Sequence, residues 1–548
     1  MPGKLVLSLL AALTLGYSQL GLAIVTLDGH SITPQMIANV ADGEAVAVAP
    51  AAIKSVTMSH KVLIEAAQNG LKIYGLTVGV GLNKDRPMVD VHGKLTQEVV
   101  DASKKFNVGL LHAHSGGIGE PMSIRVARAT LVTRLNALLN GGGGVQPAIV
   151  DAYVAFLNKG ITPVIPADGS VGEGDITVIS HIGLAMLGEG EVYYQGNKVA
   201  ASAALQSSQT PAITPYAKDA LAILSSNAYS AASGALALDS LAHLMQVNTL
   251  TYALSLQALN GNVSPFLANT LALRPYPEVA AMGKNLRELL AGSSLWQHDD
   301  SRPLQDPLSF RSGVYLLAEL QRSYRQAYDQ LLVQLNSSDD NPGVALNVTA
   351  PSQRPQEAVG YVSEGNLQGA VLPSANFEPL PWVLAFEQLG LALAHNSLAN
   401  AQQVVKLNNP AFTGLSRFLG TEHTVHAFGA MEKPVMMLAM RNKELAMPVS
   451  LDYFPVAGDI EDIATNAPAV VERVQRQVDN AYQLLGILLV HDAQAVSLRQ
   501  QRHNGFTLSA PTAKLYAAIR QQVPFIEIDR PLAPDFAAAE QVLRQYGR

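Results

Sequence analysis

The chain has 548 residues, of which 48% are hydrophobic and 15% charged, with a formal net charge of −7 and no cysteine. This length allows a large buried core, built as one big helical unit or as two to three domains. Because the net charge is negative, the chain lacks the excess of basic residues that is typical of a nucleic-acid-binding protein, and nucleic acid is not an expected partner. The absence of cysteine excludes disulfides, thiolate metal ligands and cysteine nucleophiles.

The N-terminus predicts an export signal over residues 1–23. Lys4 supplies the positive start, residues 5–15 form a short apolar core, and residues 21–23 (Gly-Leu-Ala) offer small side chains to a signal peptidase. The alternatives are an uncleaved anchor or a start codon placed too early. We therefore expect a periplasmic or secreted protein. No membrane contact is expected after signal removal, because no later segment reaches the roughly 18 uninterrupted apolar residues of a spanning helix.

Two regions with different patterns follow the signal. Residues 24–205 combine short helices, such as one over 50–70, with Gly-rich turns, and we predict an N-terminal domain that carries loops of the active site. Residues 206–548 are predicted to form a central and C-terminal helical bundle domain, because their long apolar helices are buried only by packing together. The helices predicted there cover residues 217–259, 312–335, 381–405 and 463–499.

The most informative segment is residues 169–175, which read Gly-Ser-Val-Gly-Glu-Gly-Asp. It resembles the signature region of the aromatic amino acid ammonia-lyases, and in particular the motif of the histidine ammonia-lyases. In that family an Ala-Ser-Gly tripeptide in this loop cyclises into an electrophilic methylidene-imidazolone (MIO) ring. Here the segment is one residue shorter and Glu173-Gly174 fills the gap. The resemblance therefore implies a lyase scaffold without an MIO, and we expect no cofactor.

Two further segments carry the resemblance in the N-terminal region. Tyr74 opens a Gly-rich loop that ends at Gly81, and the resemblance implies that this tyrosine is the base that removes the substrate's β-proton. Alone, it would be interpreted as a core tyrosine beside a turn. His114 matches the histidine of the family's His-x-x-Gly-Ile-Gly turn. Its neighbour His112 suggests a metal, but no third ligand has suitable spacing, so no metal site is predicted.

Two more segments carry it in the helical region. Residues 305–311 read Gln-Asp-Pro-Leu-Ser-Phe-Arg, and the resemblance implies that Gln305 and Arg311 bind the substrate, with the arginine on its carboxylate. Residues 339–342 (Asp-Asp-Asn-Pro) and residues 374–377 (Ser-Ala-Asn-Phe) resemble a second pair of family motifs. The resemblance makes Asn376 another contact on the carboxylate side.

The chain also departs from the family pattern. Leu308 replaces a tyrosine, Glu378 stands at a histidine position, and Arg441 stands where histidine ammonia-lyases carry a glutamate that faces the imidazole. A family asparagine falls at Ser225 or at Asn227. The residue that recognises the aromatic ring of the substrate is predicted to be Arg441, Lys443, Glu444 or Glu378. The one Ala-Ser-Gly, at residues 232–234, lies inside a predicted helix, and we interpret it as helix packing.

Together these patterns predict a mainly α fold like that of histidine and phenylalanine ammonia-lyases, with a long central helical bundle. The resemblance implies a homotetramer whose active sites are each built from three subunits. The leading hypothesis is a carbon–nitrogen lyase that acts without an MIO and resembles ergothionase, releasing trimethylamine from an imidazole-type betaine. Glu173 would face the leaving amine. The alternatives are a histidine or aromatic amino acid ammonia-lyase or aminomutase, and a non-catalytic protein that binds an amino acid or betaine.

Overall fold

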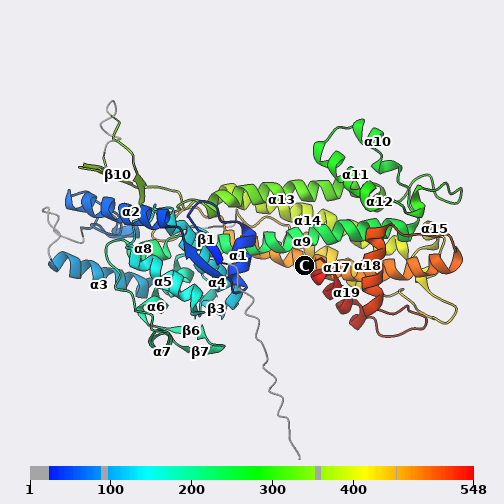
Figure 1. Cartoon of the computed structure of the whole chain (residues 1–548), viewed down its shortest axis with the longest axis horizontal. Coiled ribbons are helices and arrows are strands. Elements are labelled where there is room, and N and C mark those ends of the chain that lie inside the picture. The colour runs from blue at the N-terminus through cyan, green and yellow to red at the C-terminus, as the bar shows by residue number, and fades with distance from the viewer. Residues whose placement is uncertain (1–23, 88–96, 352–358, 452, 454, 548) are drawn as a thin grey trace, which may run out of the picture.

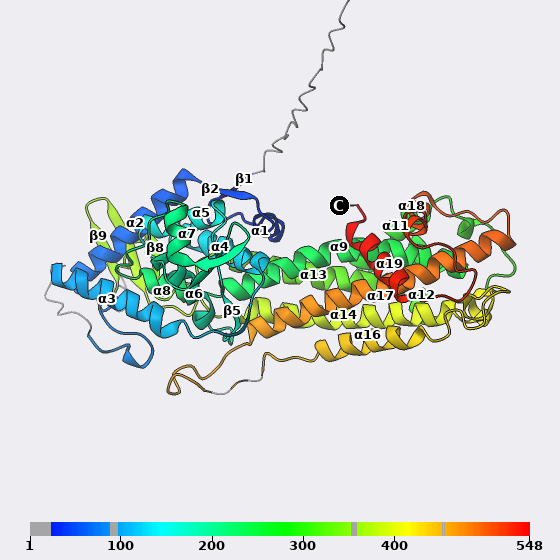
Figure 2. The same cartoon turned by 90° about the horizontal axis from the view of Figure 1, so that it is seen from below.

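The computed structural model describes residues 24–87, 97–351, 359–451, 453 and 455–547. The predicted signal, residues 1–23, lies outside this part of the chain. The described part is mainly helical, as predicted (Figure 1). A group of short elements packs at one end, and a set of long helices extends away from it (Figures 1 and 2).

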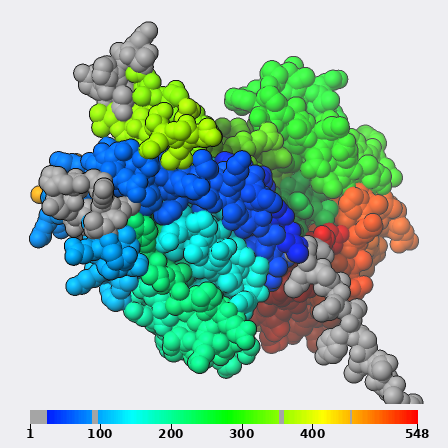
Figure 3. All heavy atoms as spheres, turned by 60° about the vertical axis from the view of Figure 1, so that its left-hand side comes forward, coloured from blue at the N-terminus to red at the C-terminus, as the bar shows by residue number. Residues whose placement is uncertain are grey.

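The N-terminal region alternates short helices and strands. Thr33 caps the first helix by accepting a hydrogen bond from the Met36 amide, and prolines begin α1, α2 and α5, where a missing amide hydrogen does no harm. Figure 3 shows these elements as one continuous surface. Its helices are α1 Pro34–Ala41, α2 Pro50–Gln68, α3 Gln97–His114, α4 Ile124–Leu139, α5 Pro147–Asn158, α6 Ile176–Leu187, α7 Ala201–Ser207 and α8 Asp219–Leu224. Its strands are β1 Ile24–Leu27, β2 Ala45–Val48, β3 Ile118–Pro121, β4 Thr162–Pro163, β5 Pro166–Asp168, β6 Glu191–Tyr194 and β7 Asn197–Ala200.

The strands form small separate sheets rather than one large one. β1 pairs with β2 in parallel, with Ile24 opposite Ala45, and β3 pairs with β5 in antiparallel fashion. β4, β6 and β7 form a second antiparallel group. A third group, in the order β8-β10-β9, comes from the helical half of the chain and packs on α2. These three strands are β8 Gly343–Leu346, β9 Tyr361–Glu364 and β10 Leu367–Leu372.

Long helices make up the rest of the molecule. The three most extensive helix–helix interfaces join α9 to α17, α17 to α14, and α14 to α13, so four long helices share one core (Figure 2). Gly234 allows this contact, because a β-carbon there would lie 3.1 Å from Phe386 Cζ and 3.4 Å from Val471 Cγ1. The Ala-Ser-Gly at 232–234 thus lies inside α9, near its N-terminal end, and the prediction that it belongs to a helix is confirmed. The helices are α9 Ala228–Leu259, α10 Ala268–Ala272, α11 Pro277–Leu289, α12 Leu308–Arg311, α13 Gly313–Leu335, α14 Leu380–Leu407, α15 Pro410–Thr413, α16 Glu432–Leu445, α17 Ala467–Arg502, α18 Ala510–Gln522 and α19 Ala533–Gln545.

The helix predicted over 217–259 is broken in the structure. α8 ends at Leu224 and α9 begins at Ala228, and two of the residues between them, Ser226 and Asn227, bond to a distant segment. Ser226 Oγ and the Asn227 amide both donate to Asp339 Oδ2, at 2.8 Å each. Local apolar periodicity carries no information about such long-range bonds, so the sequence predicted one helix.

One helical stretch of the described residues is long and apolar enough to span a membrane, Asp219–Leu259. Its most apolar window is 83% buried inside the protein. A core helix of a large bundle has this character, because every face of it meets another helix.

Candidate active site

The loop of residues 169–175 is held tightly against the start of α9. Asp175 is fully buried and accepts hydrogen bonds from Ser170 Oγ at 2.6 Å, the Ser230 amide at 2.8 Å and Ser230 Oγ at 2.7 Å. Burial raises the pKa of Asp175 to about 6, although these donors oppose the rise. Gly172 has a φ of 91° and lies so close to α17 that a β-carbon would lie 2.7 Å from the Ala467 nitrogen. The loop therefore has a fixed shape, with Glu173 at its turn.

Asn227 connects this loop to two other segments. Its side-chain oxygen accepts from the Gly174 amide at 2.9 Å, and its side-chain nitrogen donates to the Phe377 carbonyl. Its own amide donates to Asp339. Of the two positions proposed for the family's asparagine, the structure places Asn227 against the loop, whereas Ser225 is half-buried at the end of α8.

A buried ion cluster lies behind these segments. Arg134 donates to Asp339 at 3.1 Å and to Asp340 at 2.9 Å, and Lys218 donates to Asp340 at 3.2 Å. All four side chains are at most 2% exposed. Burial raises the pKa of Asp340, but Arg134 and Lys218 outweigh burial and hold it below its usual value. The Asp-Asp-Asn-Pro motif therefore has a structural role, because it ties α4, α8 and the start of α9 together.

Glu173 is the centre of an acidic cluster. Its Oε1 atom is buried and has no hydrogen-bond partner among the described residues. Burial, followed by the charges of Glu378 and Glu461, raises the pKa of Glu173 to about 8. No cation of the described part of the chain is among the groups that shift this pKa. The cluster thus brings three carboxylates within electrostatic range of one another without a described counter-charge, which suits a cationic ligand.

The connection between α16 and α17 brings Glu461 to this site. The Asn466 amide donates to the Val171 carbonyl at 2.8 Å, so the end of the connection joins the loop that carries Glu173. Gly458 lies against Leu82, beside the Tyr74 loop. Figure 2 shows the connection extending from α16 toward the N-terminal end of the molecule.

Sequence reasoning missed both Glu461 and Tyr453, which lie on this connection. Tyr453 donates to the Glu461 carbonyl at 3.2 Å. Burial raises its pKa, and the charges of Glu461 and Glu173 raise it further, so its ring lies within electrostatic range of both acids. The only signal in the sequence was a run of acids, Asp459, Glu461 and Asp462, between two predicted helices. That pattern is typical of an exposed loop, and only the fold turns it inward.

Tyr74 shares this environment. Its hydroxyl accepts from the Gly81 amide at 2.8 Å, which closes the Gly-rich loop. Burial raises the pKa of Tyr74, the Gly81 amide lowers it, and Glu461 raises it further. Lys84 and Arg86, just past this loop, are not among the causes of the shift, and Lys84 pairs with Asp85. The described groups of one chain therefore do not prepare Tyr74 as a base.

Of three other predicted residues, Glu378 is tied to this centre by its charge on Glu173. His114 ends α3, where its Nδ1 is 2.9 Å from the Leu110 carbonyl, and its own carbonyl accepts from Ser180 of α6. Glu378 is half-buried, with Oε1 accepting from the Leu380 amide at 2.9 Å. Asn376 is exposed next to it. His112 points elsewhere and pairs with Glu189 at 2.7 Å.

The short helix α12, which ends at Arg311 and follows Gln305 closely in the chain, lies at the opposite end of the molecule (Figure 1). Asp306, between them, accepts from the Asn262 amide just beyond the C-terminal end of α9, whereas Asn227 holds Glu173's loop at its N-terminal end. α9 has 32 residues, so at 1.5 Å per residue about 48 Å separates the two groups. One chain therefore does not bring Arg311 to Glu173.

Arg441 and Glu444 lie on the exposed side of α16. Neither is among the groups that shift the pKa of Glu173. Within one chain they have no part in the acidic cluster.

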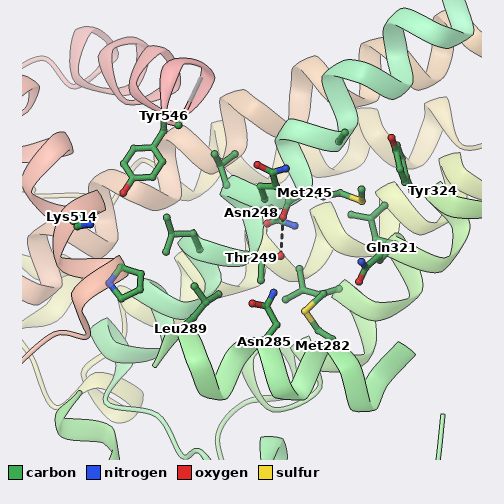
Figure 4. Close-up of a pocket in the computed structure, with 18 of the residues that line it drawn as sticks. Met245, Asn248, Thr249, Met282, Asn285, Leu289, Gln321, Tyr324, Lys514 and Tyr546 are labelled. Carbon is green, nitrogen blue, oxygen red and sulfur yellow. Dashed lines mark hydrogen bonds between the residues drawn. The ribbon is translucent and has the colours of Figure 1, made fainter. Parts of the chain in front are cut away.

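A cavity of about 720 Å³ lies between α9, α11, α13 and α18 (Figure 4). Its lining is mostly apolar, with Met245 and Met282 on it, and Lys514 is its only charged residue. Asn248 at its wall donates to Asn396 at 2.7 Å, a bond between α9 and α14. None of the predicted site residues lines this cavity, so it is not where the acids and Tyr74 meet.

The loop lacks the Ala-Ser-Gly tripeptide from which the family's MIO forms. Two residues, Glu173 and Gly174, stand between Gly172 and Asp175 in its place. No group of three or more His, Asp or Glu within the described ranges is arranged to hold a metal ion.

Residues 32–521 match the family model for aromatic amino acid lyases. Histidine ammonia-lyase from Geobacillus thermodenitrificans is 31% identical over 530 residues, which are 95% of this chain and 97% of the relative. The solved ergothionase from Treponema denticola, an ergothioneine-degrading enzyme, is 32% identical with a TM-score of 0.84 over 95% of this chain and 99% of that one. Histidine ammonia-lyase from Trypanosoma cruzi, at 22% identity and a TM-score of 0.82 over 95% and 93%, shares the fold.

These matches and the retained loops define a carbon–nitrogen lyase of the ammonia-lyase or amine-lyase type. The chain belongs to the aromatic amino acid lyase family. The predicted fold is confirmed by the same comparisons.

Proposed function

We propose that this lyase acts without an MIO and eliminates trimethylamine from an imidazole-type betaine, giving an acrylate. The observation that carries the proposal is Glu173, a carboxylate with a buried unpaired oxygen at the place of the missing tripeptide. Similarity to the solved ergothionase, over nearly the whole of both chains, supports it.

The acidic cluster suits a leaving group that is already charged. An ordinary ammonia-lyase must expel a poor leaving group, and the family uses its electrophilic ring for that. A trimethylammonium group is permanently cationic, so Glu173, Glu378 and Glu461 bind it by charge alone. When the C–N bond breaks, the nitrogen keeps the bonding pair and departs as neutral trimethylamine. The attraction then ends, which favours release.

The proton and electrons balance in one elimination. The Tyr74 phenolate oxygen takes the β-proton, the pair from the broken C–H bond forms the new C=C bond, and the C–N pair leaves with the amine. The phenolate needs positive charge nearby, because burial and Glu461 raise the pKa of Tyr74 within one chain. The substrate's own cation and an arginine from another copy supply it.

We propose that a homotetramer completes the site. Arg311, with Gln305, holds the substrate carboxylate from a second copy, since about 48 Å of α9 separates it from Glu173 in the same chain. Asn376 is assigned to the same carboxylate side, and Arg441 or Glu444 to the ring. On α14, Leu384, Leu391 and Leu398 are each about half exposed at seven-residue intervals, a stripe suited to another helix. Three subunits would contribute to each site.

The test is to incubate the purified protein with ergothioneine, hercynine and histidine, and to measure trimethylamine and ammonia. Trimethylamine from either betaine supports the proposal, and a Glu173→Gln variant should release it at least about tenfold more slowly. Ammonia from histidine, with near-ultraviolet absorbance and a mass loss of two waters, would instead establish an MIO-dependent ammonia-lyase, the activity of the histidine ammonia-lyase relatives. Thermal stabilisation by a betaine without turnover would establish a binding protein.

We also propose that the protein is exported. The support is the sequence of residues 1–23 alone. Cell fractionation and N-terminal sequencing of the mature protein test it. A start near Ile24 in the periplasmic or secreted fraction is expected, and a full-length cytoplasmic protein would contradict it.

A further inference from the structure

A second cavity, of about 570 Å³, lies at the end of the bundle where α9 and α17 end, and unlike the first cavity it is lined largely by polar residues. Three arginines line it, Arg302, Arg499 and Arg502, together with His298 and His503, whereas its lining holds a single carboxylate. Phe412 and Phe506 also lie on its wall. The cavity is therefore cationic and partly aromatic, the opposite of the acidic cluster around Glu173.

Arg499 is the key residue of this cavity. It is only 6% exposed, and its Nε donates to the Ala258 carbonyl at 2.7 Å. Its Nη2 donates to the carbonyls of Leu259 and Thr413, both at 2.6 Å. These bonds cap the C-terminal carbonyls of α9. Capping accounts for Nε and Nη2 but not for Nη1, which has no partner among the described residues.

The charge of Arg499 is not neutralised by a carboxylate. No acid lies within ion-pair distance of it in the described part of the chain, although an unpaired buried charge is costly. Burial lowers the pKa of Arg499 to about 10, with the charges of Arg502 and Arg302 contributing to this value and Asp299 opposing it. Like charges are thus held together around an open space.

The other charged residues of the cavity do not neutralise the positive charge of Arg499. Asp299, the lining carboxylate, already accepts from Asn260 at 2.7 Å and from Ser301 Oγ at 2.6 Å. Arg302 donates to the Leu295 carbonyl, and its buried Nε has no partner among the described residues. Arg502 is exposed and donates to the Gly414 carbonyl at 2.8 Å.

We propose that this cavity binds a small anion that carries a phosphate or carboxylate group on a flat ring. Guanidinium groups match the geometry of both oxyanions, and Phe412 and Phe506 offer apolar surface to the ring. A volume of about 570 Å³ lies in the range of small-molecule sites. Arg311 does not line the cavity, so the proposed anion site and the proposed contact with the substrate carboxylate use different arginines.

Calorimetry with the full-length protein tests the proposal, with adenosine monophosphate as the phosphate probe and benzoate as the carboxylate probe. Binding of either supports it, and their relative affinity identifies the oxyanion. Arg502→Gln should weaken binding at least about tenfold, since it removes one charge-assisted contact and leaves the buried arginines in place. Arg476→Gln, an exposed arginine on the same helix, is the matched control and should change nothing.

Two outcomes would overturn the proposal. One is no heat from either probe up to about 10 mM with a folded protein. The other is equal binding by Arg502→Gln and the unchanged protein. Arg311→Gln separates this site from the proposed function, because it should abolish amine release but keep full affinity for the probe.

Discussion

Glu173 is held by the fold in a state that disfavours its own charge. Burial, Glu378 and Glu461 raise its pKa to about 8, well above its ordinary value of 4.5. A raised carboxylate pKa contributes stability below about pH 4.5, and that contribution is lost as pH rises through about 8. A bound cation reverses the preference, because it stabilises the ionised form. Cation binding is therefore expected to expel a proton from the site.

This reasoning predicts a pH dependence for a simple quaternary ammonium ion. Tetramethylammonium should bind more tightly by up to about tenfold per pH unit as pH rises from 6 to 8, and then level off. The reason is that its competitor, the proton on Glu173, is progressively removed. Calorimetry in buffers of different ionisation heat measures both the affinity and the proton released.

Glu173→Gln removes the titrating group and should give weak binding without this pH dependence. Glu189→Gln changes an exposed carboxylate that pairs with His112, and it should behave like the unchanged protein. If the unchanged protein bound the ion equally at pH 6 and pH 8, the acidic cluster would not be a cation site.

At the scale of the element, α17 contains a buried acid that the site does not use. Asp492 is fully buried, accepts one hydrogen bond from Ser255 of α9 at 2.6 Å, and leaves Oδ1 without a partner among the described residues. Burial raises its pKa well above the usual value of 3.8. Neighbouring His491 is also buried, and burial lowers its pKa to about 4, so it supplies no counter-charge at neutral pH.

The sign of the pH effect follows from this raised pKa. The contribution of Asp492 to stability is full below about pH 4 and is lost as pH rises through the folded-state pKa. Asp492→Asn keeps the shape and cannot ionise, so it should match the parent at about pH 4 and melt roughly 2–5 °C higher at pH 9. Differential scanning calorimetry across this range measures the difference. The exposed control Asp151→Asn should show no such trend, and a destabilised Asp492→Asn at pH 9 would contradict the argument.

The long helices were predictable because their apolar periodicity is local. The predicted ranges 312–335 and 381–405 fall almost entirely within α13 and α14. The break at Ser225–Asn227 was not predictable, since it depends on bonds to Asp339 and Gly174 that come from distant segments. The sequence therefore gives the helices well and their interruptions poorly.

The candidate site divides in the same way. Tyr74 and Glu173 were found from motifs, and the structure places both within electrostatic range of one acid. That acid, Glu461, was missed because an acid in a connection carries no sign of burial. Gln305 and Arg311 were also found from a motif. Their distance from Glu173 was invisible, because a motif does not show which end of a helix it occupies.

At the scale of the whole molecule, one chain holds the predicted site residues in two groups, one in each half of the molecule, at opposite ends. The half with Tyr74 and Glu173 is acidic, and no described cation is among the groups that shift the pKa of Glu173. In the other half, Arg311 has no ion-pair partner among the described residues. If the proposed assembly is correct, Arg311 of one copy acts with Tyr74 of another. Two inactive variants damaged in different halves should then restore each other.

Co-expression of Tyr74→Phe with Arg311→Gln tests this directly. Each variant alone should be at least about a hundredfold slower in amine release. In randomly mixed tetramers, about one site in four receives intact Tyr74 from one chain and intact Arg311 from another, so activity should return to roughly a quarter of the parent value. Co-expressing Tyr74→Phe with Glu173→Gln is the control. Both groups come from the same half of the same chain, and mixing cannot reunite them. Rescue in the first pair but not in the second would establish shared sites, whereas no rescue in either would show that Arg311 and Tyr74 do not meet across subunits.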